Sequence, residues 1–214
     1  GLEAALIDAL DKRVQKPHVV SPSEFESWDT AYANAMRQVN IRFPGQLDVM
    51  ALFVEAMMTR SPWNLWNVEK GRPTEGADTI EAIAICQEAI RLADQLDMTQ
   101  HPAILHLHIH LLEMSPEPEQ AMDSADRLGQ LGRDAGHIHH MPGHIYVLCG
   151  EYQRAKAASE KAITADQKYL EYAGPYNYYT TSRCHNLHLM MYTCMHLAQF
   201  EAALLAAEEI CKNL

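Results

Sequence analysis

Apolar side chains recur every three or four residues along almost the whole chain, the spacing at which an α-helix presents one face. The pattern predicts helices over 2–14, about 21–42, 46–59 and 79–96. Ser21 or Ser23 is placed to cap the start of the second helix, and Pro44 with Gly45 ends it. The segment 61–76, SPWNLWNVEKGRPTEG, is predicted instead to be a long loop rich in Trp, Pro and Gly.

From Pro102 onward the predicted helices come in pairs. The pairs are about 102–114 with 118–131, 140–149 with 152–170, and 183–197 with 200–212. Pro142 fits a first helical turn better than a helix interior, so the first helix of the second pair is expected to begin near His140. His137 would then lie on the incoming loop.

The pairs share landmarks at a fixed period. Ala121 recurs as Ala155 at an offset of 34, and GEYQRAKAASEKAITAD (150–166) carries Gly, an aromatic residue and Ala at regular positions. FEAALLAAEEI (200–210) repeats the second half of that phrase, with Ala203 matching Ala155 at an offset of 48. The second offset is longer than the first, and we expect the additional residues to lie in the Tyr-rich connection 169–181.

This pattern resembles the tetratricopeptide repeat, a helix–turn–helix unit with a period of about 34 residues. The resemblance covers about 80–214 and implies an all-α fold, a superhelix of antiparallel helix pairs. We therefore expect a single tetratricopeptide-like domain over 1–214, with irregular helices over about 1–78 and helix pairs over 79–214. In this family the first helix of each pair lines a concave surface, where ligands bind.

Composition supports a folded, helical chain and narrows its partners. Of the 214 residues 48% are hydrophobic, and Ala, Leu, Met, Glu and Gln are plentiful. The net charge of −11 and the lack of a Lys/Arg cluster exclude nucleic acid as an expected partner. No apolar run is long enough for a membrane span, and the five cysteines include no CxxC pair, which together favour a cytoplasmic protein with reduced thiols and no membrane partner. The oligomeric state stays open.

The candidate chemistry lies in the histidines, of which eleven of twelve fall between His101 and His196. His106 and His110 recur as His140 and His144, at the same offset as the alanine landmarks of the first two pairs. The resemblance places three rows of side chains on the concave surface. The rows are His106, His110 and Glu113; His137, His140 and His144; and His185, His188 and Tyr192.

Imidazoles returned to one face at helical spacing can gather around a metal. We predict that His106, His110, His137, His140, His144, His185 and His188 are metal ligands, a number suited to two ions. An almost all-imidazole set favours copper, with zinc or iron as alternatives. Glu113 is a candidate ligand, orienting group or general base, and Tyr192 a candidate border of a substrate site.

The interpretation is a metal-dependent oxidoreductase acting on a small molecule or peptide in the concave groove. Zinc-dependent hydrolysis at the same site, metal storage or sensing, and a peptide- or protein-binding interaction module remain alternatives. His108 and His139 are expected to face away from the site, and His101, His196 and His18 to lie at its edge or outside it. Asp48 and Glu55, which share a helix face, either extend the inner surface or form a solvated helix face. Trp63 and Trp66 are candidates to cover the end of the groove.

Overall fold

A computed structural model describes residues 1–132 and 134–213. The described chain is helical almost throughout and forms two compact units, Gly1–Pro116 and the segment from Glu117 onward. The single domain expected from the sequence stays a prediction.

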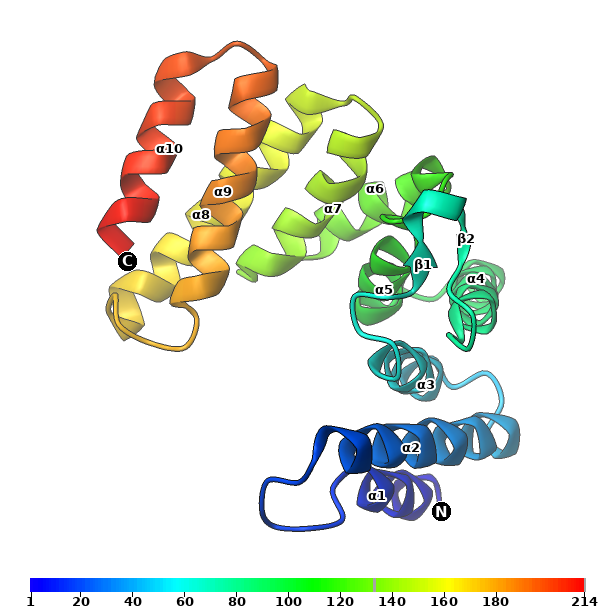
Figure 1. Ribbon diagram of the computed structural model, residues 1–214. Helices are drawn as coiled ribbons and strands as arrows, with labels where there is room; N and C mark the ends of the chain where they lie inside the picture. Colours follow the sequence, from blue (N-terminus) through cyan, green and yellow to red (C-terminus); the bar gives the residue numbers. More distant parts are fainter. Residues whose placement is uncertain (133, 214) are drawn as a thin grey trace. The chain divides into compact units, whose positions relative to one another are not determined.

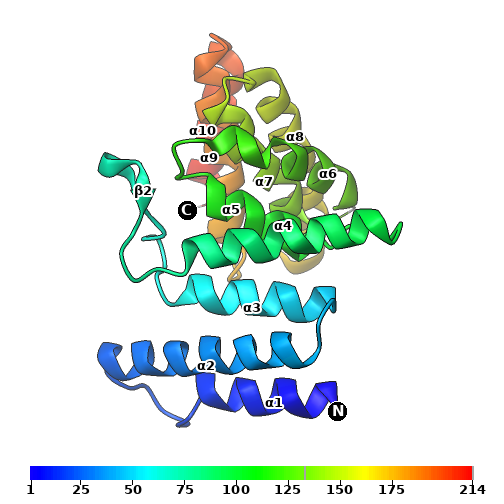
Figure 2. The ribbon, with the colours of Figure 1, turned by 90° about the vertical axis from the view of Figure 1, so that its right-hand side faces the viewer.

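The first unit is a stack of consecutive helices (Figures 1 and 2). They are α1 (Leu2–Arg13), α2 (Pro22–Arg42), α3 (Leu47–Thr59), α4 (Thr79–Gln95) and α5 (Pro102–Leu112). Each helix packs against the next, and α3 also contacts α5. Their buried faces follow the helical spacing, as in Trp28, Tyr32, Met36 and Val39 of α2. The unit therefore has one core, centred on the fully buried side chains of α3.

Local signals set the helix ends as the sequence predicts. The Ser21 hydroxyl accepts a hydrogen bond from the amide of Glu24, which caps α2 beside a proline in its first turn. The predicted loop 61–76 contains a small element that the sequence analysis missed. Strands β1 (Trp66–Asn67) and β2 (Arg72–Pro73) pair antiparallel around the 3₁₀ turn Val68–Lys70, with Gly71 at φ 58°.

The second unit consists of helix pairs. A 3₁₀ turn (Pro118–Ala121) leads into α6 (Met122–Leu131), followed by α7 (Gly136–Leu148), α8 (Tyr152–Ala173), α9 (Thr180–His196) and α10 (Phe200–Asn213). Each helix packs on the next, and α7 also packs on α9 (Figure 1). Contact between the first helices of successive pairs is what a helical repeat requires.

Turns between the paired helices share one geometry. Gly150 between α7 and α8 has φ 77°, and Ala198 between α9 and α10 has φ 56°. In each turn the next amide bonds back into the preceding helix, Glu151 to Tyr146 and Gln199 to Cys194. Gly150 and Ala198 are 48 residues apart, which is the same offset as between Ala155 and Ala203. Part of the extra length lies in α8 itself, which runs to Ala173, so the connection to α9 is shorter than the predicted 169–181.

The start of α7 differs from the prediction. The helix begins at Gly136, one turn before His140, so His137 is helical and Pro142 lies inside the helix. Burial explains the exception, because Met141 and Ile145 on either side of the proline are fully buried and hold the helix against its neighbours. Packing of the apolar face outweighs the one backbone hydrogen bond that proline removes.

Candidate functional site

Three histidines of the second unit converge on one point. His140 and His144 lie on α7 and His185 on α9, and one ring nitrogen of each lies within 4.8 Å of the others. The Nε2 atoms of His140 and His144 are 2.8 Å apart, and the His185 ring centroid is 4.5 Å from that of His140. His140 is fully buried, His144 half-buried and His185 exposed. We call His140, His144 and His185 the histidine triad.

A buried polar network sets the position of α9 against α7 and α8. Asp166 of α8 accepts hydrogen bonds from the Tyr179 hydroxyl (2.8 Å) and from the Asn186 amide nitrogen (2.6 Å). Asn186 follows His185 directly in the chain, so this bond fixes the first turns of α9. Burial raises the pKa of Asp166, while the bonds from Asn186 and Tyr179 oppose that shift.

Gly136 lets the start of α7 approach the same carboxylate. A Cβ atom at this position would lie 1.9 Å from Asp166 Oδ1 and 3.0 Å from the Tyr179 hydroxyl oxygen. Only glycine fits such an approach. The network therefore brings α8 together with α7 and α9, the two helices that carry the histidine triad.

The histidine triad has the donor type and spacing for a metal ion. Two nitrogens on a tetrahedral zinc would be about 3.3 Å apart, so His140 and His144 would have to separate by about 0.5 Å. Without a metal, the two Nε2 atoms lie within hydrogen-bond distance, so one imidazole can donate to the other. Three imidazoles leave further coordination positions open, and the exposure of His185 gives solvent access to them.

The remaining predicted ligands are distributed over both units. His137 lies one turn before His140 with its ring stacked at 6.1 Å, outside the triad but beside it. In the first unit, His106 and His110 lie one turn apart on α5, with ring centroids 4.7 Å apart. His110 Nδ1 is 2.7 Å from a carboxylate oxygen of Glu113, the pairing by which an acidic group orients an imidazole.

Two members of the third predicted row are not brought to the triad. His188 is exposed on α9, and no contact among the described residues joins it to the other three histidines. Tyr192 packs against His196, at 4.6 Å between ring centroids. His196 in turn stacks on Tyr152.

The histidines expected outside the site lie outside the triad. His108 is buried in α5, His139 faces the opposite side of α7, and His18 is exposed. His101 Nε2 is 2.9 Å from a carboxylate oxygen of Asp48, so one of the two uncertain acidic groups pairs within the first unit.

The other uncertain acidic group and the two tryptophans are also placed within the first unit. Glu55 accepts from Arg13 of α1. Trp63 is almost fully exposed, whereas Trp66 donates its indole N–H to the carbonyl of Leu111 at 2.6 Å. Glu55 and Trp66 thus have structural partners within this unit.

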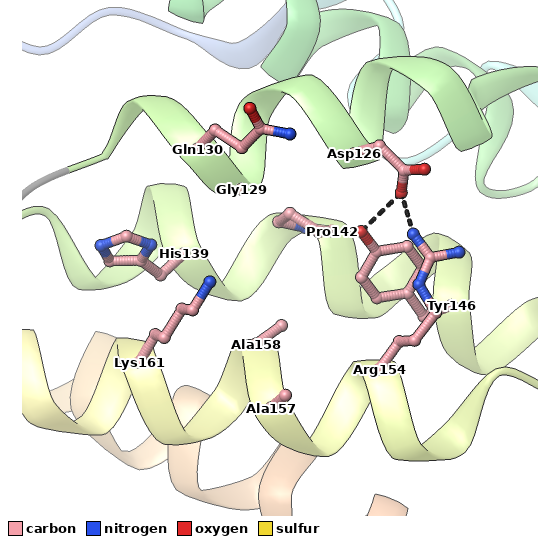
Figure 3. A pocket seen from close by; sticks show the side chains of 10 residues that line it. All are labelled: Asp126, Gly129, Gln130, His139, Pro142, Tyr146, Arg154, Ala157, Ala158 and Lys161. Carbon is pink, nitrogen blue, oxygen red and sulfur yellow. Dashed lines mark hydrogen bonds and ion pairs between the residues drawn. The ribbon is translucent and has the colours of Figure 1, made fainter.

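A hollow that the sequence analysis did not predict lies on the other side of α7 (Figure 3). Its volume is about 340 Å³, and α6, α7 and α8 form its walls. The residues that line it are Asp126, Gly129, Gln130, His139, Pro142, Tyr146, Arg154, Ala157, Ala158 and Lys161. Its only signal in the sequence is the set of small residues, which leaves space where three helices meet.

One end of this hollow is a closed network. Asp126 accepts hydrogen bonds from the Tyr146 hydroxyl (2.7 Å) and from Arg154, whose guanidinium lies 4.1 Å from the Tyr146 ring centroid. Burial and the bond to Asp126 raise the pKa of Tyr146 to about 12. At the other end, burial and the nearby Lys161 ammonium lower the pKa of His139.

Comparison with known proteins gives the fold. No protein-family model matches the sequence, and no curated protein matches it. Among solved structures, the chain is similar to one described as the crystal structure of MamA protein, with a TM-score of 0.63. The match covers 99% of this chain and 92% of that one, at 13% sequence identity. The fold is tetratricopeptide-like.

At this identity the likeness is one of fold alone. It supports the all-α arrangement of helix pairs and carries no ligand or activity from one protein to the other. No helix among the described residues is long and apolar enough to cross a membrane. The surfaces and side-chain clusters of this tetratricopeptide-like chain therefore carry the indications of its function.

Proposed function

We propose that the chain is an interaction module that binds a segment of a partner protein. The fold supports this function, because helical-repeat proteins expose extended surfaces built from successive helix pairs. The observation that carries the proposal is a group of tyrosines, two of them almost fully exposed, where α8 ends and α9 begins.

This tyrosine cluster consists of Tyr169, Tyr172, Tyr178 and Tyr179. The ring centroids of Tyr169 and Tyr179 lie 5.3 Å apart. Burial raises the pKa of Tyr169, and the neighbouring Tyr178 and Tyr172 raise it further. Tyr172 and Tyr178 are 88% and 89% exposed. Such rings combine a rigid apolar body with a polar tip, which makes tyrosine common at protein interfaces.

A peptide library displayed on phage and selected against the purified chain tests this function. Selected peptides should bind the wild type, and the double substitution Tyr172→Ser, Tyr178→Ser should weaken them by about tenfold or more. Trp63→Ser removes an equally exposed aromatic ring from the first unit and should leave their affinity unchanged. Equal binding by all three proteins would exclude the tyrosine cluster as the recognition surface.

A second function is favoured by the histidine triad. We propose that His140, His144 and His185 hold a transition metal, copper first and zinc or iron next, because the donors are all imidazole. His106 and His110 with Glu113 belong to the same proposal as a further metal-binding group, and His137 and His188 as donors that the ion in the histidine triad does not require. Copper or iron with an open coordination position would support oxidation of a small molecule or peptide by oxygen. Zinc with a bound water would support hydrolysis.

In that metalloenzyme proposal, Glu113 orients an imidazole or acts as a general base, and Tyr192 borders the substrate. The distance between Glu113 and His110 supports the first of these roles for Glu113. Oxygen uptake by the copper-loaded protein with a catechol as probe tests turnover. Bound metal without uptake or hydrolysis would favour storage or sensing.

Substitution of His185 and His188, two exposed histidines one turn apart on α9, tests metal binding itself. Untagged protein incubated with copper, zinc or iron and then desalted should retain metal, measured by mass spectrometry. His185→Ala should lower the retained metal by about one equivalent, whereas His188→Ala should keep that equivalent. Because both side chains are exposed, neither substitution should unfold the chain. Equal loss from the two variants would contradict the histidine triad as the site.

A further inference from the structure

The side of α7 turned away from the histidine triad carries a ligand-sized hollow. Pro142 and Tyr146 face it from α7, one turn apart, together with Gly129 of α6 and Ala157 and Ala158 of α8 (Figure 3). No large side chain fills the space between these small residues, which leaves a volume of about 340 Å³. That volume is at the small end of the range for ligand pockets, so it suits a side chain or a short acid rather than a large cofactor.

Charge in the hollow is positive, in contrast to the chain as a whole. Lys161 and Arg154 are cationic and Asp126 is the only acidic lining residue, which leaves one net positive charge in a protein of net charge −11. Asp126 already accepts hydrogen bonds from Arg154 and Tyr146, so that ion pair is internally satisfied. The uncompensated charge is Lys161.

Lys161 stands at the open end of the hollow. It makes no ion pair or hydrogen bond with another described residue, and Figure 3 shows its ammonium group directed toward the space between α6, α7 and α8. His139 and the Gln130 amide lie at the same end. One lysine with two further hydrogen-bonding side chains suits a monoanion, because a phosphate dianion would meet too little positive charge.

We propose that this hollow binds a carboxylate carried on a short apolar stem. Lys161 pairs with the carboxylate, Gln130 and His139 are placed to hydrogen-bond it, and the stem lies over Pro142 and Ala158. A peptide C-terminus, an acidic side chain and a small carboxylic acid share this chemistry. The proposal depends neither on the tyrosine cluster nor on the histidine triad, so it can fail while those functions stand.

Titrations followed by amide chemical shifts test the proposal. The probes are pentanoate, a short peptide ending in Leu with a free carboxylate, the same peptide amidated, and inorganic phosphate. We expect pentanoate, the free-acid peptide or both to shift the amides of Gly129 and Ala158, with weaker or no shifts from the amidated peptide and phosphate. Pentanoate alone would identify a small-acid site, and the peptide acid a protein C-terminus.

Three variants locate the site. Lys161→Gln should weaken binding of the active probe by about tenfold, since it removes the charge-assisted contact. Lys212→Gln makes the same charge change on α10, outside the hollow, and should leave binding unaltered. Ala157→Leu, at an exposed position, should block binding by filling the space without disturbing the core.

The proposal is overturned by any of three results. These are no saturable shifts with either acid, equal effects of Lys161→Gln and Lys212→Gln, or binding of the amidated peptide as tight as that of the free acid. Circular dichroism of each variant shows whether the helices persist, so a loss of binding through unfolding is recognised directly.

Discussion

Replacing Gly136 by alanine should destabilise the second unit far more than replacing Gly143, although both lie on α7. At Gly136 the added methyl would lie 1.9 Å from Asp166 Oδ1 and 2.7 Å from its Cγ. The carboxylate is buried and held by Tyr179 and Asn186, so it can move only by losing those bonds. A hydrogen bond to a charged group contributes roughly 1.5–3 kcal/mol, and alanine returns at most about 1 kcal/mol of helix propensity.

We therefore expect Gly136→Ala to lower the free energy of unfolding by about 2–3 kcal/mol. At Gly143 the one close contact of the methyl would be with Leu189 Cδ2, at 2.7 Å, which is the end of a flexible side chain; Leu189 Cγ and the Ala155 carbonyl oxygen lie at ordinary contact distances of 3.8 and 3.9 Å. Rotating that leucine costs about 0.5–1.5 kcal/mol, close to the propensity that alanine gains. Gly143→Ala should thus change stability by less than about 1 kcal/mol.

Urea denaturation followed by far-ultraviolet circular dichroism measures both values. Thermal unfolding should show a decrease of about 5–10 °C for Gly136→Ala. Hydrogen exchange should place the lost protection in α7, α8 and α9. Equal stability of the two variants, or protection lost elsewhere, would refute the role assigned to the Asp166 network.

Three other outcomes follow from the structure. Ala198→Gly should raise the free energy of unfolding by up to about 1 kcal/mol, and Gly150→Ala should lower it similarly, because both turns need a left-handed residue; urea midpoints measure this. Burial raises the pKa of Cys86 to about 12, so at pH 8 a thiol reagent should modify the exposed Cys211 while Cys86 reacts only after unfolding. Tyr146 holds its proton more tightly in the folded state than in the unfolded state. The free energy of unfolding should therefore fall by on the order of 2 kcal/mol between about pH 10 and 12. Urea titrations across this range should show a smaller fall for Tyr146→Phe.

Hydrophobic spacing was enough to predict the helices of this chain, most of them with only small errors at their ends. The start of α7 was wrong because the penalty of an interior proline was weighed against local sequence alone. The burial of Met141 and Ile145, which offsets that penalty, depends on neighbouring helices. The pairing of Trp66 and Asn67 with Arg72 and Pro73 was missed because such short strands show no alternation that a sequence can reveal.

The histidine triad was only partly foreseeable. A spacing of four on one helix predicts that His140 and His144 lie together, and the structure confirms that contact. Whether His185 or His188 joins them depends on how α9 is rotated against α7. The hydrogen bond from Asn186 to Asp166 influences this rotation, and because it joins α9 to α8, the pattern within one helix does not reveal it. The hollow lined by Lys161 was not foreseeable, because small side chains from three helices form no periodic pattern.

Helix α7 carries His140 and His144 on one side and Pro142 and Tyr146 on the other. Any rotation or shift of α7 that moves these two imidazoles relative to His185 on α9 also reshapes the opposite wall, which faces the hollow. If a metal ion at the histidine triad and an acid in the hollow each favour a different position of α7, binding at one site must change the affinity of the other. The factor is the same in both directions. A repeat protein would then sense two unlike ligands through one segment of backbone.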